Sequence, residues 1–195
     1  MNRIPVRVLI LTFGAFSFLL SSCASQFGDN DSYNQTASND QLPPYQRVHD
    51  YTNYAERLPQ QIDTNGKKVV VIDPSAHAWG AYDSDGNLIR AGIATAGGDW
   101  CEDTGRPCRT SVGKFKIRSL GGSECFSSKY PLPDGGGLMP YCMFFNGDQA
   151  LHGSPDLAVV EDNISHGCVR MRIPDAEWLR FNFAQIGTPV IVKSY

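Results

Sequence analysis

The sequence predicts a mainly β domain, a mixed β-sandwich or barrel-like arrangement with one short helix near the C-terminus. From residue 67 onward, short runs rich in Val, Ile and aromatic residues alternate with Gly, Pro, Asn and Asp. Such runs favour strands, and the residues between them favour turns. Hydrophobic residues make up 42% of the chain and charged residues 19%, which is typical of a globular protein.

The first expected strand, Lys68-Val69-Val70-Val71-Ile72-Asp73, is a β-branched run that suits a central buried position. The polar segment 83–87 predicts a turn before the third strand. The expected strands span residues 68–73, 76–82, 88–94, 113–119, 141–145, 150–152 and 189–193.

One helix is expected between the last two predicted strands. Ala176, Leu179 and Phe183 lie at helical spacing and would form its apolar face. Asp175 is the expected N-cap, and Gly187 would end the helix.

The N-terminus has the features of an export signal. Arg3 and Arg7 precede an apolar stretch, 8–20, that is shorter than the ~20 residues a membrane span needs. This stretch ends in Leu20-Ser21-Ser22-Cys23, which resembles the lipobox of bacterial lipoproteins, where Cys23 would carry the lipid. An ordinary secretory signal with a chance cysteine is the alternative.

We therefore expect a lipoprotein signal peptide at 1–22, a lipid-anchored polar linker at 23–65 and the folded domain at 66–195. The expected location is the periplasmic side of the cell envelope. Ala24 follows Cys23, where Asp would resemble an inner-membrane retention signal, so the outer membrane is favoured.

Cysteine usage agrees with an oxidising compartment. If Cys23 carries lipid and Cys168 stays free, four cysteines remain, with three possible pairings. We prefer Cys101–Cys108, which flank a segment containing Gly and Pro, and hence Cys125–Cys142. Zinc is the alternative for these four, but no C-x-x-C spacing supports it.

The residues that carry chemistry lie in two short segments, His152-Gly153-Ser154 and the run from Ser165 to Met171. Cys168 stands next to a glycine and between residues that can be cationic, an arrangement that predicts a lowered thiol pKa. His152 ends a predicted strand and could serve as its base. The N–H groups of Gly167 and Cys168 could stabilise an oxyanion.

These segments resemble the signature of the L,D-transpeptidase family (YkuD type). That signature is a His-Gly pair, a loop, Ser/Thr-His-Gly-Cys, an aliphatic residue and Arg. The resemblance extends over about residues 67–195, with a departure at Thr110-Ser111-Val112-Gly113, where family members often have Thr-Pro-x-Gly. The matching residues are His152, Gly153, Ser165, His166, Gly167, Cys168, Val169 and Arg170.

By that resemblance Cys168 is the nucleophile, His152 is the general base, and the Gly153 backbone carbonyl orients the imidazole. His166 and Gly167 would shape the oxyanion pocket, His166 more by position than as a base.

The resemblance further implies substrate-binding roles for Arg170, Tyr141 and Ser165. Cys168 would be acylated by the tetrapeptide stem of peptidoglycan with loss of D-Ala. The acyl group would then pass to an amine of a neighbouring stem, or of an envelope protein that becomes anchored. Carbapenem-type inhibitors are expected to acylate Cys168, and no metal or organic cofactor is needed.

Other interpretations remain. Water could resolve the acyl-enzyme, giving an L,D-carboxypeptidase or endopeptidase. The chain could instead be a non-catalytic peptidoglycan-binding lipoprotein, with Cys168 a core residue and His152 and His166 structural. A zinc site at these three residues lacks a fourth ligand. The formal net charge of −3, without a basic stripe, argues against a nucleic-acid partner.

Overall fold

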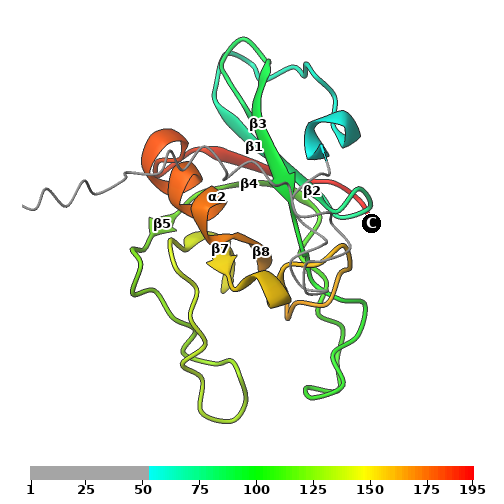
Figure 1. Ribbon diagram of the computed structural model, residues 1–195, viewed down its shortest axis with the longest axis vertical. Helices are drawn as coiled ribbons and strands as arrows, with labels where there is room; N and C mark the ends of the chain where they lie inside the picture. Colours follow the sequence, from blue (N-terminus) through cyan, green and yellow to red (C-terminus); the bar gives the residue numbers. More distant parts are fainter. Residues whose placement is uncertain (1–52) are drawn as a thin grey trace, which may run out of the picture. The chain divides into compact units, whose positions relative to one another are not determined.

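The computed structural model describes residues 53–195 (Figure 1). The predicted signal peptide, Cys23 and the linker up to residue 52 lie outside these residues. No helix between residues 53 and 195 has the length and apolarity to cross a membrane. The described part is mostly β, with one short α-helix, as the sequence predicted.

The larger sheet has five strands in the order β3-β2-β1-β9-β4. The pair β1 and β9 is parallel, while the other neighbours are antiparallel. The predicted β-branched run therefore forms the central strand. The strands are β1 (Val69–Asp73), β2 (Ala78–Tyr82), β3 (Leu88–Ile93), β4 (Gly113–Lys116) and β9 (Pro189–Val192).

The smaller sheet has four strands in the order β5-β6-β7-β8. Its last pair, β7 and β8, is parallel. The helix α2 (Ile173–Trp178) follows β8 directly and packs against both β7 and β8 (Figure 1). The strands are β5 (Ser119–Leu120), β6 (Met143–Asn146), β7 (Gln149–Ser154) and β8 (Val169–Arg172).

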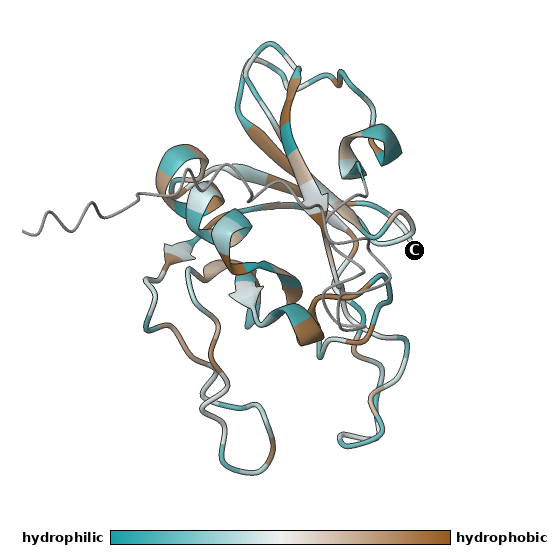
Figure 2. Cartoon of the chain, in the orientation of Figure 1, coloured by the Kyte–Doolittle hydropathy of each residue, from teal (hydrophilic) through white to brown (hydrophobic). Residues whose placement is uncertain are grey.

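The main core lies between the two sheets and the helix. It joins Ile72 and Val190 of the larger sheet to Leu151 and Met171 of the smaller one, with Leu179 following α2. Figure 2 shows hydrophobic segments along the strands, while hydrophilic residues make up much of the helix. This core fixes the edge formed by β7 and β8, where the chemistry-bearing residues lie.

The helix differs from the prediction in both its start and its end. It begins at Ile173 with Arg172 at the N-cap position, and Pro174 supplies a backbone angle already suited to a first turn. Asp175, the predicted cap, lies inside the first turn and pairs with Arg90 at 2.8 Å. The α-helix also ends at Trp178, before the end predicted at Gly187. A π-helical turn, η4 (Leu179–Phe183), follows it directly.

The folded domain includes residues that precede the predicted boundary at residue 66. A 3-10 helix, η2 (Tyr54–Arg57), packs against the larger sheet, and Tyr54 and Leu58 are buried there. The Tyr54 hydroxyl and the Arg57 guanidinium both donate to Glu161, each at 2.9 Å. This segment therefore braces the loop that joins β7 to β8.

Candidate active site

The parallel pairing of β7 and β8 brings His152 and Cys168 to one face of the smaller sheet. His152 lies opposite Arg170 in the ladder. Cys168 comes directly before β8 and packs against the buried cluster that contains Ala150 of β7. Ala150 is two residues before His152, and residues two apart on a strand point to the same face, which puts Cys168 on the His152 side of the sheet. Parallel strands need a long crossover, and residues 155–168 supply it.

His152 is buried, with 5% of its surface exposed. Its Nδ1 lies 2.8 Å from the backbone oxygen of Gly153, the contact that the sequence analysis expected. If Nδ1 carries the proton and donates it there, Nε2 keeps a lone pair for a substrate or thiol proton. Burial, opposed by the Gly153 hydrogen bond and helped by the charge of Arg170, lowers the pKa of His152 to about 4. The imidazole is therefore neutral at physiological pH.

Cys168 does not have the lowered pKa that its sequence context predicted. Burial raises the pKa of the Cys168 thiol and Asp148 adds to this, while the Ala150 backbone and Arg170 act in the opposite direction. The half-buried thiol donates to the backbone oxygen of Asp148 at 3.5 Å. Desolvation penalises the charged thiolate more than the cation helps it. At neutral pH the Cys168 thiol is consequently protonated and the His152 imidazole is uncharged.

Ser165 and Gly167 form a turn that holds the Cys168 backbone. Ser165 is buried, its hydroxyl donates to the Cys168 carbonyl, and it accepts the Gly167 N–H at 3.1 Å. Gly167 has φ of 119°, which L side chains rarely adopt, and an added Cβ would approach Gln149 at 3.1 Å. These two hydrogen bonds show that the Ser165 hydroxyl holds the turn, while its expected contact with substrate stays a prediction. The Gly167 N–H was expected to donate in the oxyanion pocket, but in this structure it donates to the Ser165 hydroxyl.

His166 points to partners that the sequence analysis missed. Its Nε2 lies 2.8 Å from both carboxylate oxygens of Asp103. The ring of Tyr130 packs on the imidazole with centroids 4.4 Å apart. No local pattern could reveal this cluster, because its members come from loops far apart in the sequence.

Arg170 lies opposite His152 in the ladder, whereas the Tyr141 side chain packs against the main core. Within residues 53–195, the Arg170 guanidinium forms no salt bridge with a carboxylate, which leaves its charge available to a ligand. Pro140 accepts the Gly153 N–H at 2.8 Å, which places Tyr141 beside the strand of His152. Tyr141 has φ of 61°, a costly angle for a tyrosine, and its hydroxyl donates to Glu177 at 2.9 Å.

The two predicted disulfides, Cys101–Cys108 and Cys125–Cys142, are both present, and Cys168 is the free cysteine of the described part. One group in residues 53–195, Cys101, Asp103 and His166, has the closeness of metal ligands. Cys101 offers no thiolate because its sulfur is in a disulfide, so this group is not a zinc site.

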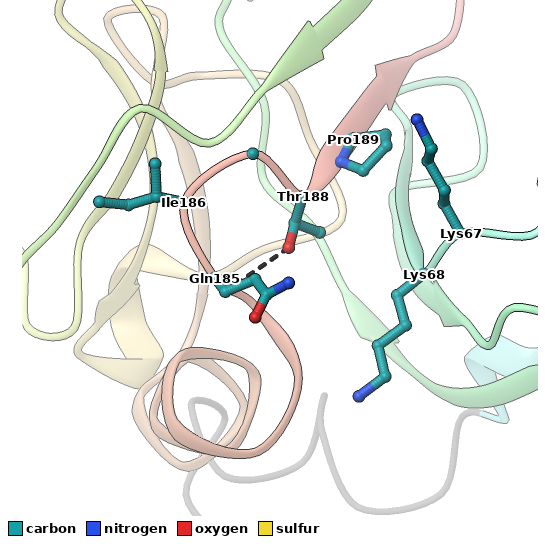
Figure 3. A pocket seen from close by; sticks show the side chains of 7 residues that line it. Lys67, Lys68, Gln185, Ile186, Thr188 and Pro189 are labelled. Carbon is teal, nitrogen blue, oxygen red and sulfur yellow. Dashed lines mark hydrogen bonds between the residues drawn. The ribbon is translucent and has the colours of Figure 1, made fainter.

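A recess elsewhere on the domain, between the start of β1 and the turn before β9, has no part in this chemistry (Figure 3). Figure 3 shows two lysines on one side and a hydrogen-bonded turn on the other, and neither His152 nor Cys168 lines this recess. Its lining residues are Lys67, Lys68, Gln185, Ile186, Gly187, Thr188 and Pro189.

Comparison with known proteins places this geometry in a family. Residues 67–192 match the sequence model of YkuD, the L,D-transpeptidase catalytic domain. No curated protein sequence gives a significant match.

Solved L,D-transpeptidases have the same fold. A structure from Xylanimonas cellulosilytica has 27% identity and a TM-score of 0.57, covering 69% of this chain and 64% of its own. One from Stackebrandtia nassauensis has 24% identity and a TM-score of 0.56, covering 72% and 64%. L,D-transpeptidase 3 from Mycobacterium tuberculosis, solved with a faropenem-derived adduct, has 26% identity and a TM-score of 0.51, covering 65% and 60%. This chain therefore spans less than two thirds of these relatives.

Proposed function

The chain belongs to the YkuD family of L,D-transpeptidase catalytic domains, and on that premise we propose that it joins peptidoglycan stem peptides through an acyl-enzyme at Cys168. The observation that carries the proposal is one shared sheet face with a thiol, an imidazole oriented by the Gly153 carbonyl, and the cation of Arg170. A nucleophile, a base and a group that orients the base are the minimum for acyl transfer.

In the first step the Cys168 sulfur attacks the carbonyl carbon of the third stem residue while Nε2 of His152 takes the thiol proton. The tetrahedral intermediate then expels the amine of the terminal D-Ala, which receives that proton from the imidazolium. An imidazole with a pKa of about 4 holds a proton weakly, so it passes the proton readily to the leaving amine.

In the second step an amine of a neighbouring stem attacks the thioester carbonyl. His152 removes a proton from the attacking nitrogen, and the Cys168 sulfur leaves and is reprotonated. The product is a cross-link between two stems, or an envelope protein attached to one stem. The acceptor is selected by the shape of the cleft and by water access rather than by the nucleophile.

Two further roles belong to this proposal. Arg170 would pair with a carboxylate of the stem peptide, since its planar guanidinium suits bidentate contact with carboxylates. The Cys168 N–H would donate to the oxyanion, with Tyr141 at the border of the donor cleft. The faropenem-derived adduct in the M. tuberculosis relative supports acylation of Cys168 by β-lactams as well, the class to which carbapenems belong.

The cellular setting is also proposed. Cys23 would carry a lipid that tethers the domain at the periplasmic face of the outer membrane, within reach of peptidoglycan. Replacing Cys23 with alanine should release the protein from the membrane fraction into the soluble periplasmic fraction. Retention of that variant in the membrane would contradict the lipid anchor.

Product analysis tests the function. The purified protein is incubated with disaccharide-tetrapeptide, and the products are identified by mass spectrometry. Cross-linked dimers are expected. Tripeptide monomers alone would instead indicate an L,D-carboxypeptidase, and unchanged substrate would indicate a binding protein. Cys168→Ser, which keeps the size of the side chain, should abolish every product, and full activity in that variant would overturn the assignment of the nucleophile.

A further inference from the structure

Two disulfide-closed loops meet at His166, beside the proposed nucleophile. The first is closed by Cys101–Cys108 and the second by Cys125–Cys142. Both project from the same end of the domain, at the lower edge of Figure 1. Asp103 of the first loop holds His166 Nε2, and Tyr130 of the second loop packs on its ring.

The loops also bind one another. Arg106, in the first loop, donates to the Tyr130 hydroxyl at 3.0 Å. The first loop thus reaches His166 twice, directly through Asp103 and indirectly through Tyr130. The Cys101–Cys108 disulfide and the hydrogen bond from the Cys101 N–H to the Arg106 oxygen, at 3.0 Å, close the part of the first loop that carries Asp103 and Arg106.

The base of the first loop is attached to the catalytic motif on both sides. On one side, Gly98 donates to the Ser165 oxygen at 2.9 Å. On the other, the buried Thr110 hydroxyl donates to the Gly167 oxygen, also at 2.9 Å. Because both ends of the first loop bind the backbone of Ser165 and Gly167, the Asp103 carboxylate has a fixed position relative to His166. A surface ion pair on a free loop would have no such constraint.

We infer that Asp103 is a positioning residue for acyl transfer at Cys168: it acts through His166 and is held in place by the Cys101–Cys108 disulfide. This inference rests on the proposed function. By fixing the His166 ring, Asp103 sets the backbone of residues 166–168 at the wall where the oxyanion forms. Small misplacements there cost rate in the acyl-transfer steps, whereas the intrinsic reactivity of the thiol is unaffected.

The central variant is Asp103→Asn, which removes the charge and keeps the size. Asp103→Glu restores a carboxylate. The matched control is Asp99→Asn, since Asp99 also accepts a side-chain hydrogen bond, in its case from Arg109 at 2.6 Å, but has no contact with His166. Three rates are measured: acylation by p-nitrophenyl acetate, release of D-Ala from disaccharide-tetrapeptide, and alkylation by iodoacetamide, which forms no oxyanion.

Asp103→Asn should slow ester acylation and lower kcat for D-Ala release by about tenfold, with KM changed less than about twofold. Alkylation and the thermal midpoint should match the native protein, Asp103→Glu should recover most of the rate, and Asp99→Asn should behave as native. An unchanged acylation rate in Asp103→Asn would overturn the inference. So would an equal loss in alkylation, because that would mean a general disturbance of the thiol.

A double-mutant cycle tests the route through His166. His166→Gln and the combined Asp103→Asn/His166→Gln variant should be equally slow. If the losses of acylation rate in the two single variants added fully in the double variant, Asp103 would act by a route that does not include His166. Cys101→Ser/Cys108→Ser should slow acylation as Asp103→Asn does, and a native rate in a folded double variant would remove the disulfide from the inference.

The p-nitrophenyl acetate assay distinguishes failure of the proposed function from failure of the inference about Asp103. If the native protein is acylated by p-nitrophenyl acetate at Cys168 but leaves the tetrapeptide unchanged, the proposed function fails and the Asp103 series still decides on the ester. If the native protein is acylated by neither compound, both the function and the inference are wrong.

Discussion

Replacing His152 with glutamine should remove a loss of stability that the native protein shows in acid. His152 is buried, and its pKa falls from 6.5 to about 4 on folding, chiefly because burial disfavours the imidazolium. Between these two pH values the unfolded chain binds a proton that the folded chain does not. Stability therefore decreases as pH falls from 6.5 towards 4, and the full loss is present below that window.

The magnitude follows from the two pKa values. At about 1.4 kcal/mol for each pH unit, the difference between 6.5 and about 4 corresponds to roughly 3 kcal/mol. At pH 4.5 the loss is about 2.5 kcal/mol, and at pH 7.5 it is close to zero. For a small domain this is a sizeable fraction of the total stability.

Urea unfolding at pH 7.5 and pH 4.5 measures the effect. The drop in unfolding free energy between the two pH values should be about 2.5 kcal/mol smaller in His152→Gln than in the native protein. Carboxylates that titrate in the same range contribute to both proteins and cancel. Equal drops in His152→Gln and the native protein would refute a buried neutral imidazole.

Three further predictions concern the motif. Because burial raises the pKa of the Cys168 thiol, alkylation by iodoacetamide should keep increasing as the pH rises past 9. A plateau below pH 7 would instead indicate a thiolate–imidazolium pair. Ser165→Ala should lower the unfolding free energy by about 1–3 kcal/mol, because the buried Gly167 N–H and the Cys168 carbonyl lose their partner. A native denaturation midpoint would contradict that role. Arg170→Gln should raise KM for the tetrapeptide by about tenfold and change iodoacetamide alkylation little, because a charge-assisted hydrogen bond contributes about 1.5–3 kcal/mol. An unchanged KM would remove Arg170 from substrate binding.

The sequence predicted those parts of the fold that have a local signal. The run Val69–Asp73 is a central strand because β-branched residues suit a strand buried on both faces. By contrast, Val169–Arg172 was not predicted as a strand. It is short, and its pairing with β7 is parallel and therefore depends on a crossover rather than on a neighbouring turn.

The same limit applies to the site. The pair of His152 and Cys168 could be predicted because the motif carries both residue types at characteristic spacing. The direction of the Cys168 pKa could not, since it depends on burial by residues from several strands. The contact between His166 and Asp103 joins residues 63 positions apart in the chain, and nothing near either residue predicts it.

The central claim, that Cys168 is the residue acylated during turnover, is tested most directly by trapping the acyl-enzyme. The native protein is mixed with disaccharide-tetrapeptide in the absence of excess acceptor, quenched in acid, and analysed by intact-mass and peptide-mapping mass spectrometry. The account predicts a mass increase equal to the substrate less D-Ala, located on the peptide that contains Cys168 and missing in His152→Gln at the same time point. An adduct located on any other residue, or turnover with no dependence on Cys168, would contradict it.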